Sequence, residues 1–207
     1  MPRAGRPRSE LSRCRILETA LRLARTRGYA NITMDEIATE AGAGKQTIYR
    51  WWRSKAEVVL DALRENARVE ILVPDTGSLR EDISGYLSGT FDTQQRRTGM
   101  TRVLQAMMAE SQHNNDFADL FRTNFIEPRR ETIRTIFVRA HARGEIQTLD
   151  DVNLWIDVAF GVLWYRLLAG VGPLDDTLAE KLATLLSVAS GARPKGEPPV
   201  AAEEGTA

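Results

Sequence analysis

A short run of polar and aromatic side chains near residue 50 has the chemistry needed to contact a nucleic acid. An ammonium, an amide, hydroxyls, a guanidinium and an indole N–H occur close together, at Lys45, Gln46, Thr47, Tyr49, Arg50 and Trp51. In a major groove lysine pairs with guanine and glutamine with adenine, so Lys45 and Gln46 are the candidates for reading base edges. This surface is too polar and aromatic to be only a core face, although plain surface decoration is the alternative for each residue.

The first of two short helices that position these side chains begins at a capping box. Thr33 is followed three positions later by Glu36, and each side chain can bind the other residue's free backbone N–H. A helix is therefore predicted from Met34. Gly42 is placed to adopt the left-handed conformation that closes this helix.

The second helix carries the polar and aromatic run itself. Gly44 can cap its start, and the helix is predicted from about residue 45 through residue 52. Ile48 is its inward anchor. Two helices joined by a short glycine-containing turn, the second rich in such groups, form the helix-turn-helix pattern.

Residues 33–55 resemble the DNA-binding domain of the TetR family of one-component transcriptional regulators. Residues 16–20 and 27–29 agree with the family's first helix and the turn after it, so the resemblance covers roughly residues 12–62. Gly44 stands where the family usually has Ser or Thr, which removes a phosphate-contacting hydroxyl. Trp52 replaces a common Phe with a larger ring that can still pack inward.

The resemblance implies further DNA contacts and partners. Positions that commonly contact phosphates or nearby bases are matched by Thr33, Thr47, Tyr49, Trp51 and Lys55, and Arg50 is included for its guanidinium. A homodimer places two recognition helices on an approximately palindromic double-stranded DNA operator. The family expectation is a repressor that responds to a small-molecule effector, which the sequence leaves unidentified.

Charge is divided unevenly along the chain, although the net charge is zero. Residues 1–55 contain 12 Lys and Arg against 5 Asp and Glu, whereas residues 56–207 contain 16 against 23. A basic N-terminal part is expected of a module that neutralises phosphates. Residues 1–8 combine Arg with Pro and Gly, which predicts a flexible basic arm that enters a minor groove or stays a solvated tail.

Helical periodicity predicts an all-α chain of two domains. A three-helix DNA-binding domain with the helix-turn-helix is expected over residues 9–54, beginning with a helix over residues 9–27 in which Cys14 is interpreted as a small core residue. A long helix from Lys55 is expected to bridge to a helical ligand-binding and dimerisation domain, residues 55–190. Residues 191–207 are predicted to be a disordered tail.

Five helices are predicted in the second domain, near residues 78–95, 98–112, 115–143, 149–170 and 175–189. Pro128 should kink or divide the third, because proline removes a backbone hydrogen bond. The fourth is apolar on almost every side. A membrane span is the competing interpretation, but Asp157 and Arg166 interrupt a stretch of barely membrane length, so no membrane association is expected.

A dimer interface is expected from the last two helices. Asp157 and Arg166 point to opposite sides of one helix, because nine residues correspond to about 900° of rotation. A partner subunit or a neighbouring helix must supply their counterparts, unless each reaches solvent at its own edge. The resemblance implies a four-helix bundle across the dimer, and the last helix offers a seam of Leu178, Leu182, Leu185 and Ala189.

An apolar effector cavity is predicted from Met and aromatic residues of the second domain. The candidate lining residues are Met100, Leu104, Met107, Met108, Phe117, Phe121, Phe125, Phe160 and Trp164. Such residues at helical spacing also form ordinary core, which is the alternative. No cofactor or metal site is predicted, and His113 and His141 lack convincing ligand spacing.

Other classes of function explain fewer of these features. The sequence lacks the HExxH and GxSxG motifs and Gly-rich phosphate loops, and a helical enzyme using scattered carboxylates leaves the basic helix-turn-helix unexplained. A protein-interaction module without specific DNA binding is the other alternative, and the retained polar residues of the second short helix argue against it. The single Cys and the lack of an apolar run after the first charges favour a cytoplasmic protein.

Overall fold

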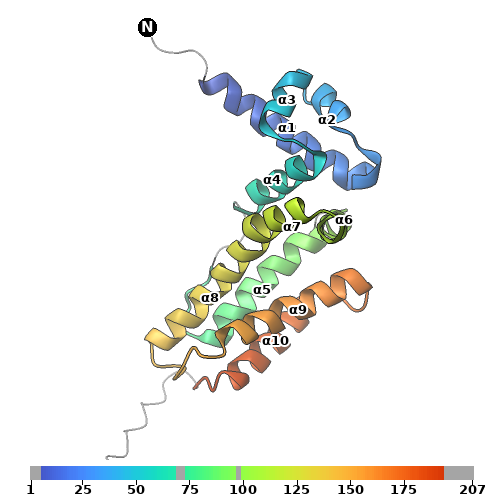
Figure 1. Cartoon of the computed structure of the whole chain (residues 1–207). Coiled ribbons are helices and arrows are strands. Elements are labelled where there is room, and N and C mark those ends of the chain that lie inside the picture. Colours follow the sequence, from blue (N-terminus) through green and yellow to red (C-terminus); the bar gives the residue numbers. More distant parts are fainter. Residues whose placement is uncertain (1–5, 69–72, 97–98, 194–207) are drawn as a thin grey trace, which may run out of the picture. The chain divides into compact units, whose positions relative to one another are not determined.

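Helices make up the regular structure of residues 6–68, 73–96 and 99–193, the part of the chain that the computed structural model describes (Figure 1). The predicted all-α class is therefore confirmed. The chain divides into two compact units. The N-terminal unit takes the residues through 71 together with 92–129 and 167–169, and the second unit takes the remainder.

The first helix, α1 (Arg6–Arg27), begins three residues before its predicted start. A helix thus replaces the predicted flexible arm at residues 6–8, while residues 1–5 of that arm lie outside the described residues. Pro7 is compatible with the first helical turn, because its missing N–H has no intrahelical acceptor there.

Four short elements complete the first part of the N-terminal unit. They are the 3₁₀ turn η1 (Tyr29–Asn31) and the helices α2 (Met34–Glu40), α3 (Lys45–Trp51) and α4 (Lys55–Arg68). Fully buried apolar side chains from all four helices form the core, including Ile16, Ala20, Leu23, Ile37, Ile48, Val58 and Val59. Arg13 of α1 donates to Asp61 of α4 at 2.8 Å, so α4 packs along α1.

Cys14 is exposed, so the prediction that it is a core residue is wrong. It lies four residues before Glu18, which is also exposed, and therefore on the outer side of α1. The apolar stripe of this helix runs instead through Leu17, Ala20 and Ala24.

The N-terminal unit also contains α6 (Met100–His113), α7 (Asn115–Phe121) and the π-helical turn η2 (Arg122–Ile126). Helix α8 (Glu127–Ala142) follows directly. The single helix predicted over residues 115–143 is therefore divided, as expected, just before Pro128. Proline fits this position because the first turn of a helix needs no N–H donor.

The second unit is built from most of α5 (Leu79–Arg96), α8, α9 (Val152–Ala169) and α10 (Asp176–Ala189). Its core contains the fully buried Ile83, Leu87, Ile133, Phe137, Ile156 and Ala179. The rings of Phe137 and Trp155 lie 5.2 Å apart. Asp175 caps α10 by accepting the Leu178 N–H at 2.9 Å.

The domain boundary predicted after residue 54 differs from this division, because α4 packs along α1 inside the N-terminal unit. The predicted end of the bridging helix, at residues 69–72, lies outside the described residues. The prediction of a disordered tail from residue 191 is wrong for residues 191–193. The backbone N–H groups of Ala192 and Arg193 donate to the carbonyls of Ser187 and Glu145, both at 2.9 Å. Residues 194–207 lie outside the described residues.

Gly99 allows α6 to pack closely on the last turn of α1. It caps α6 with a φ of 85°, and a Cβ there would lie 2.3 Å from the Arg25 carbonyl oxygen. An alanine must therefore both accept a left-handed conformation and displace backbone. We expect Gly99→Ala to lower the free energy of unfolding by about 3 kcal/mol and the melting temperature by about 6–12 °C, measured by circular dichroism.

Gly144 provides the matched control for this substitution. Its φ is 73°, but a Cβ there would meet nothing within 4 Å. Gly144→Ala should therefore cost only the left-handed strain, about 1–2 kcal/mol. Equal losses for the two variants would contradict the close approach of α6 to α1.

Candidate nucleic-acid interface

The N-terminus of α2 has the predicted capping box. Thr33 Oγ1 accepts the Glu36 N–H at 3.2 Å, and Glu36 Oε2 accepts the Thr33 N–H at 2.8 Å. The Thr33 hydroxyl also donates to Glu36 Oε2 at 2.9 Å. Its donor is therefore engaged within the protein, and a phosphate must compete with Glu36 for it.

The turn between α2 and α3 is closed by backbone hydrogen bonds. Ala43 N–H donates to Ala38 O at 2.9 Å, and Gly42 N–H donates to Thr39 O at 3.1 Å. Gly42 has a φ of 63°, the left-handed conformation expected from its position. Gly44 is the N-cap of α3 and forms no side-chain cap, as the absence of a hydroxyl dictates.

One face of α3 packs into the core of the N-terminal unit, and the other face is exposed to solvent. Ile48 is fully buried, as predicted. Exposed side chains from the rest of the helix are Lys45, Gln46, Tyr49 and Arg50, whereas Thr47 and Trp51 are partly exposed. Base-edge candidates thus stand at the start of the helix, which in a helix-turn-helix is the part that reaches the bases.

Two adjacent tryptophans at the end of α3 have different environments. Trp52 is 6% exposed, so its larger ring packs inward as predicted, and its indole N–H donates to Asp61 at 3.2 Å. The Trp51 ring lies edge-on to it, 5.4 Å away, and the Arg50 guanidinium lies 5.9 Å from the Trp51 centroid. This contact restrains Arg50 only weakly, because exposed cation–π pairs contribute little.

Asp35 also belongs to this surface, although it was not predicted from the sequence. Its carboxylate accepts from Lys45 Nζ at 2.5 Å, and this hydrogen bond raises the pKa of the Lys45 ammonium. Both side chains are well exposed, so DNA can displace the pair at small cost. Asp35 is thus an intramolecular competitor for the ammonium that is expected to contact guanine.

The Lys55 ammonium is already bound by groups of the protein, so it is less available to a DNA phosphate than an unengaged lysine. Its ammonium donates to the carbonyl oxygens of Tyr29 at 2.9 Å and Ile32 at 3.0 Å, with a longer contact to Ala30 at 3.4 Å. It also lies 4.5 Å from the centroid of the Tyr29 ring. The phosphate contact remains a prediction, and the structure adds a structural role for this lysine.

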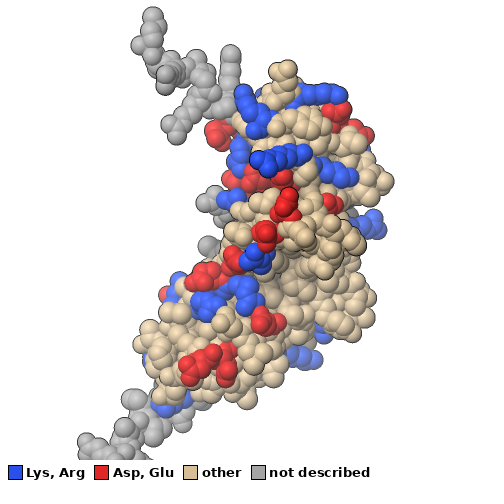
Figure 2. All heavy atoms as spheres, viewed as in Figure 1, with Lys and Arg blue, Asp and Glu red and all other residues tan. Residues whose placement is uncertain are grey.

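Basic and acidic side chains alternate over the N-terminal helices (Figure 2). Some of the positive charge is neutralised within the protein. Arg22 and Arg27 both pair with Glu40, at 2.7 and 2.6 Å. The excess of 12 basic over 5 acidic residues through residue 55 therefore overstates the charge available to phosphates.

Comparison with known proteins assigns this architecture to a family. The model for bacterial regulatory proteins of the tetR family matches residues 16–62, and the model for the tetracyclin repressor-like C-terminal domain matches residues 73–186. An uncharacterized HTH-type transcriptional regulator of Bacillus subtilis (strain 168), YdeS, is 32% identical over 178 residues, which cover 86% of this chain and 89% of the relative. The chain belongs to the TetR family.

Two further TetR-family comparisons cover nearly the whole chain. The DNA-binding transcriptional repressor TetR of Mycobacteroides abscessus is 32% identical over 190 residues, 90% of this chain and 98% of the relative. The crystal structure of the TetR family transcription regulator SCO0332 matches with a TM-score of 0.74 at 29% identity, covering 88% of this chain and 99% of that one. The protein is therefore a DNA-binding transcriptional regulator, and its family is one of regulators rather than enzymes.

Most of the residues predicted to line an effector cavity in this TetR-family chain are buried. In the N-terminal unit Leu104, Met107, Phe121 and Phe125 are at most 3% exposed, and Met108 is partly exposed. In the second unit Phe160 is 9% exposed and Trp164 is partly exposed. These environments match the alternative of ordinary core, and the cavity lining stays a prediction.

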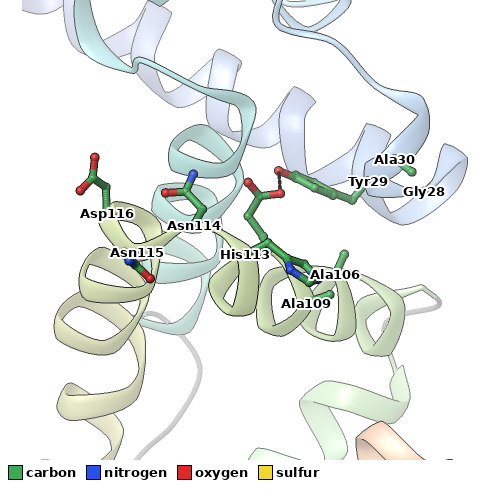
Figure 3. A pocket seen from close by; sticks show the side chains of 10 residues that line it. Gly28, Tyr29, Ala30, Ala106, Ala109, His113, Asn114, Asn115 and Asp116 are labelled. Carbon is green, nitrogen blue, oxygen red and sulfur yellow. Dashed lines mark hydrogen bonds between the residues drawn. The ribbon is translucent and has the colours of Figure 1, made fainter.

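Two surface cavities of the N-terminal unit are lined by other residues. A pocket of about 860 Å³ lies between η1 and the junction of α6 with α7, with Tyr29, Glu110 and Asp116 in its lining (Figure 3). A smaller one, of about 230 Å³, lies beside Trp52 and Asp61. His113 lines the larger pocket.

The dimer seam stays a prediction, and only two of its four residues are available to a partner subunit. Leu178 and Leu182 are 7% and 5% exposed, so they pack into their own chain, whereas Leu185 and Ala189 are exposed. The most exposed large apolar side chains described in the second unit are Leu154 and Tyr165 of α9, at 58% and 65% exposure, and Leu185 and Val188 of α10, at 53% and 75%. Because α9 is apolar on almost every side, its sequence does not show which side packs inside the chain.

The counterparts of the two charges in α9 come from the same chain. Arg130 of the neighbouring helix α8 donates to Asp157, and Arg166 donates to the Pro173 carbonyl at 2.5 Å. The neighbouring-helix alternative is therefore correct for Asp157. Neither charge needs a counterpart from a partner subunit. Asp157 and Arg166 therefore give no support to a dimer interface.

Helix α9 is long and apolar enough to cross a membrane, with a mean hydropathy of 1.3 over 18 residues. A core helix of a soluble protein passes the same test. In this chain the helix packs against α8 through Trp155 and lies within the match to the TetR-family C-terminal domain. With 39% of the span buried, packing within one chain accounts for part of its apolar character.

Gln46→Ala is expected to relax sequence preference more than it weakens binding. A glutamine that pairs with adenine contributes about 1–3 kcal/mol of discrimination, which the alanine loses. The measurement is the ratio of dissociation constants for a selected operator and for a duplex with one changed base pair. Gln112→Ala, at an exposed glutamine of α6, is the control and should keep the ratio. Undiminished discrimination in Gln46→Ala would remove Gln46 from base readout.

Proposed function

We propose that this protein is a cytoplasmic repressor that binds an approximately palindromic operator as a homodimer and releases it when a small molecule binds. The single observation that carries the proposal is the exposed face of α3, a helix anchored by buried Ile48 and presenting Lys45 and Gln46 at its start. The description of the M. abscessus relative as a repressor supports the direction of regulation.

Each residue of the helix-turn-helix that is predicted to contact DNA has a proposed role. Lys45 and Gln46 read base edges, and Thr47, Tyr49, Arg50 and Trp51 contact phosphates or nearby bases. Thr33 contributes from the start of α2, and Lys55 from the start of α4. Lys45 must first leave Asp35, so part of its binding energy is used to break an existing ion pair.

Outward apolar side chains on α9 and α10 support the homodimer. Leu154, Tyr165, Leu185 and Val188 are all more than half exposed within one chain. Burying such side chains favours association, and α9 and α10 from two subunits supply four helices for a bundle. A two-fold dimer then presents two recognition helices to successive major grooves, about 34 Å apart.

Ligand response requires that the effector bind one conformation better than the other, since equal affinity for both shifts nothing. The effector is proposed as a small molecule because this is typical of the family. Its chemistry is open. The apolar residues Leu104, Met107, Met108, Phe121, Phe125, Phe160 and Trp164 are retained as the proposed lining, with a conformational opening needed to admit a ligand among the buried ones.

The proposal is tested by selecting bound sequences from a random duplex pool with the purified protein at two salt concentrations. An enriched palindrome is the expected result, with affinity that falls as salt rises because counterions are released from phosphates. Weak binding with strong salt dependence and no consensus would overturn the proposal. Only a basic surface would then remain, and a protein-interaction module would become the better hypothesis.

A further inference from the structure

The phenol of Tyr29 joins the helix-turn-helix region to α6. Its hydroxyl donates to Glu110 Oε2 at 3.1 Å, the bond drawn dashed in Figure 3. Tyr29 is the first residue of η1, and Glu110 lies in the last turn of α6. Burial and the Glu110 carboxylate raise the pKa of Tyr29 well above its ordinary value, so the phenol keeps its proton and remains a donor into the alkaline range.

Lys55 contacts the same ring. Its ammonium lies 4.5 Å from the Tyr29 centroid and also binds the Tyr29 carbonyl. A phenol that donates to a carboxylate has a more electron-rich ring, which attracts a cation more strongly. The hydrogen bond to Glu110 and the contact with Lys55 therefore reinforce each other.

These contacts meet at the two ends of the helix-turn-helix. Ile32, whose carbonyl accepts from Lys55 at 3.0 Å, immediately precedes the capping residue Thr33 of α2. Lys55 is the first residue of α4, shortly after the recognition helix ends. One lysine thus ties the chain entering the motif to the chain leaving it, and Tyr29 attaches that junction to α6.

Helix α6 has two further attachments in the N-terminal unit. Gly99 brings its start against the Arg25 carbonyl, and Gln105 donates to the carbonyl of Leu167, near the end of α9, at 2.7 Å. Because Tyr29 and Glu110 line the open pocket, their bond can break and be hydrated without unpacking the core. Loss of this one hydrogen bond would therefore release η1 from α6 while both elements keep their own backbone hydrogen bonds.

We infer that Glu110 positions the helix-turn-helix through Tyr29 and Lys55, so that α6 determines whether the recognition helix is held ready for DNA. The inference rests on the proposed function and deepens it, because it names the contact through which regulation reaches the DNA-binding surface. Glu110 and Tyr29 act as positioning residues and need no contact with DNA.

A double-mutant cycle of Tyr29→Phe and Glu110→Ala tests this coupling. Tyr29→Phe removes one hydroxyl and no charge, and the charge lost in Glu110→Ala cancels within the cycle. Hydrogen exchange is measured on the full chain without DNA, and the dissociation constant with a selected operator. We expect Tyr29→Phe to speed exchange of the amides of α2 and α3 about tenfold, to leave α10 unchanged, and to weaken operator binding about fivefold. The double variant should be no worse than the weaker-binding single variant.

Glu131→Ala, at an exposed carboxylate of α8, is the matched control for Glu110→Ala and should change neither measurement. Additive effects on operator binding, or unchanged exchange in α2 and α3, would overturn the inference. Faster exchange throughout the chain would also overturn it, because that result describes a general loss of stability. The exchange measurement needs no operator. It therefore decides the inference even where sequence selection fails and the proposed function is lost.

Discussion

Leu185→Glu is expected to convert the proposed dimer into a folded monomer and to weaken operator binding by about a hundredfold or more. Leu185 is 53% exposed in the single chain and lies on α10, as does Val188, which is 75% exposed. A glutamate therefore remains solvated in the monomer but is desolvated in an α9–α10 interface. Two half-sites joined by a dimer bind as one unit, and this gain is lost when the subunits separate.

Analytical ultracentrifugation measures the association state, and titration of a labelled operator measures affinity. Val138→Glu places the same side chain at another outward residue of the second unit, on α8, where Val138 is 45% exposed. This control should remain a dimer with unchanged affinity. A dimeric Leu185→Glu protein with full operator binding would move the interface away from α10.

Signals that act within a few residues were predictable from the sequence. The capping box of Thr33 with Glu36, the left-handed Gly42 and the inward Ile48 all appear in the structure as expected. Each depends on local hydrogen bonding, backbone conformation or helical spacing. The helix-turn-helix therefore followed from its own residues, and the resemblance to one family agreed with it.

Features that depend on packing between distant segments were not predictable in the same way. No spacing in the sequence predicts the hydrogen bond between Tyr29 and Glu110. The pairing of Asp35 with Lys45 can be predicted only when the geometry of the turn between α2 and α3 is known. The seam of α10 was assigned to a dimer although Leu178 packs inward, because a helical period shows that a stripe is buried but not against which chain.

Lys55 illustrates how a family position and a structural contact lead to different expectations. The sequence predicts a phosphate contact, for which removal of the charge lowers the salt dependence of binding. The structure shows two carbonyls within 3.0 Å of the ammonium and a third at 3.4 Å. Removal of the donors leaves those carbonyls without a partner, which destabilises the fold itself.

Lys55→Met is therefore expected to lower the free energy of unfolding by about 2 kcal/mol and the melting temperature by about 4–8 °C. Operator binding should weaken about tenfold or more, since the start of α2 and the start of α4 are no longer held together. Thermal denaturation and operator titration over a series of salt concentrations separate the loss of stability from the loss of charge.

Lys45→Met is the matched variant, because it removes the same charge from an ammonium that binds an exposed side chain, Asp35, and not backbone carbonyls that hold the motif together. Its melting temperature should change by less than about 2 °C, since exposed ion pairs contribute little, while the salt slope falls by about one. The opposite pattern in Lys55→Met, an unchanged melting temperature with a slope lowered by about one, would leave Lys55 with a phosphate contact and no structural role. It would also remove the junction on which the coupling of Glu110 to the recognition helix depends, so this pair of variants tests the stability of the motif and its route of control together.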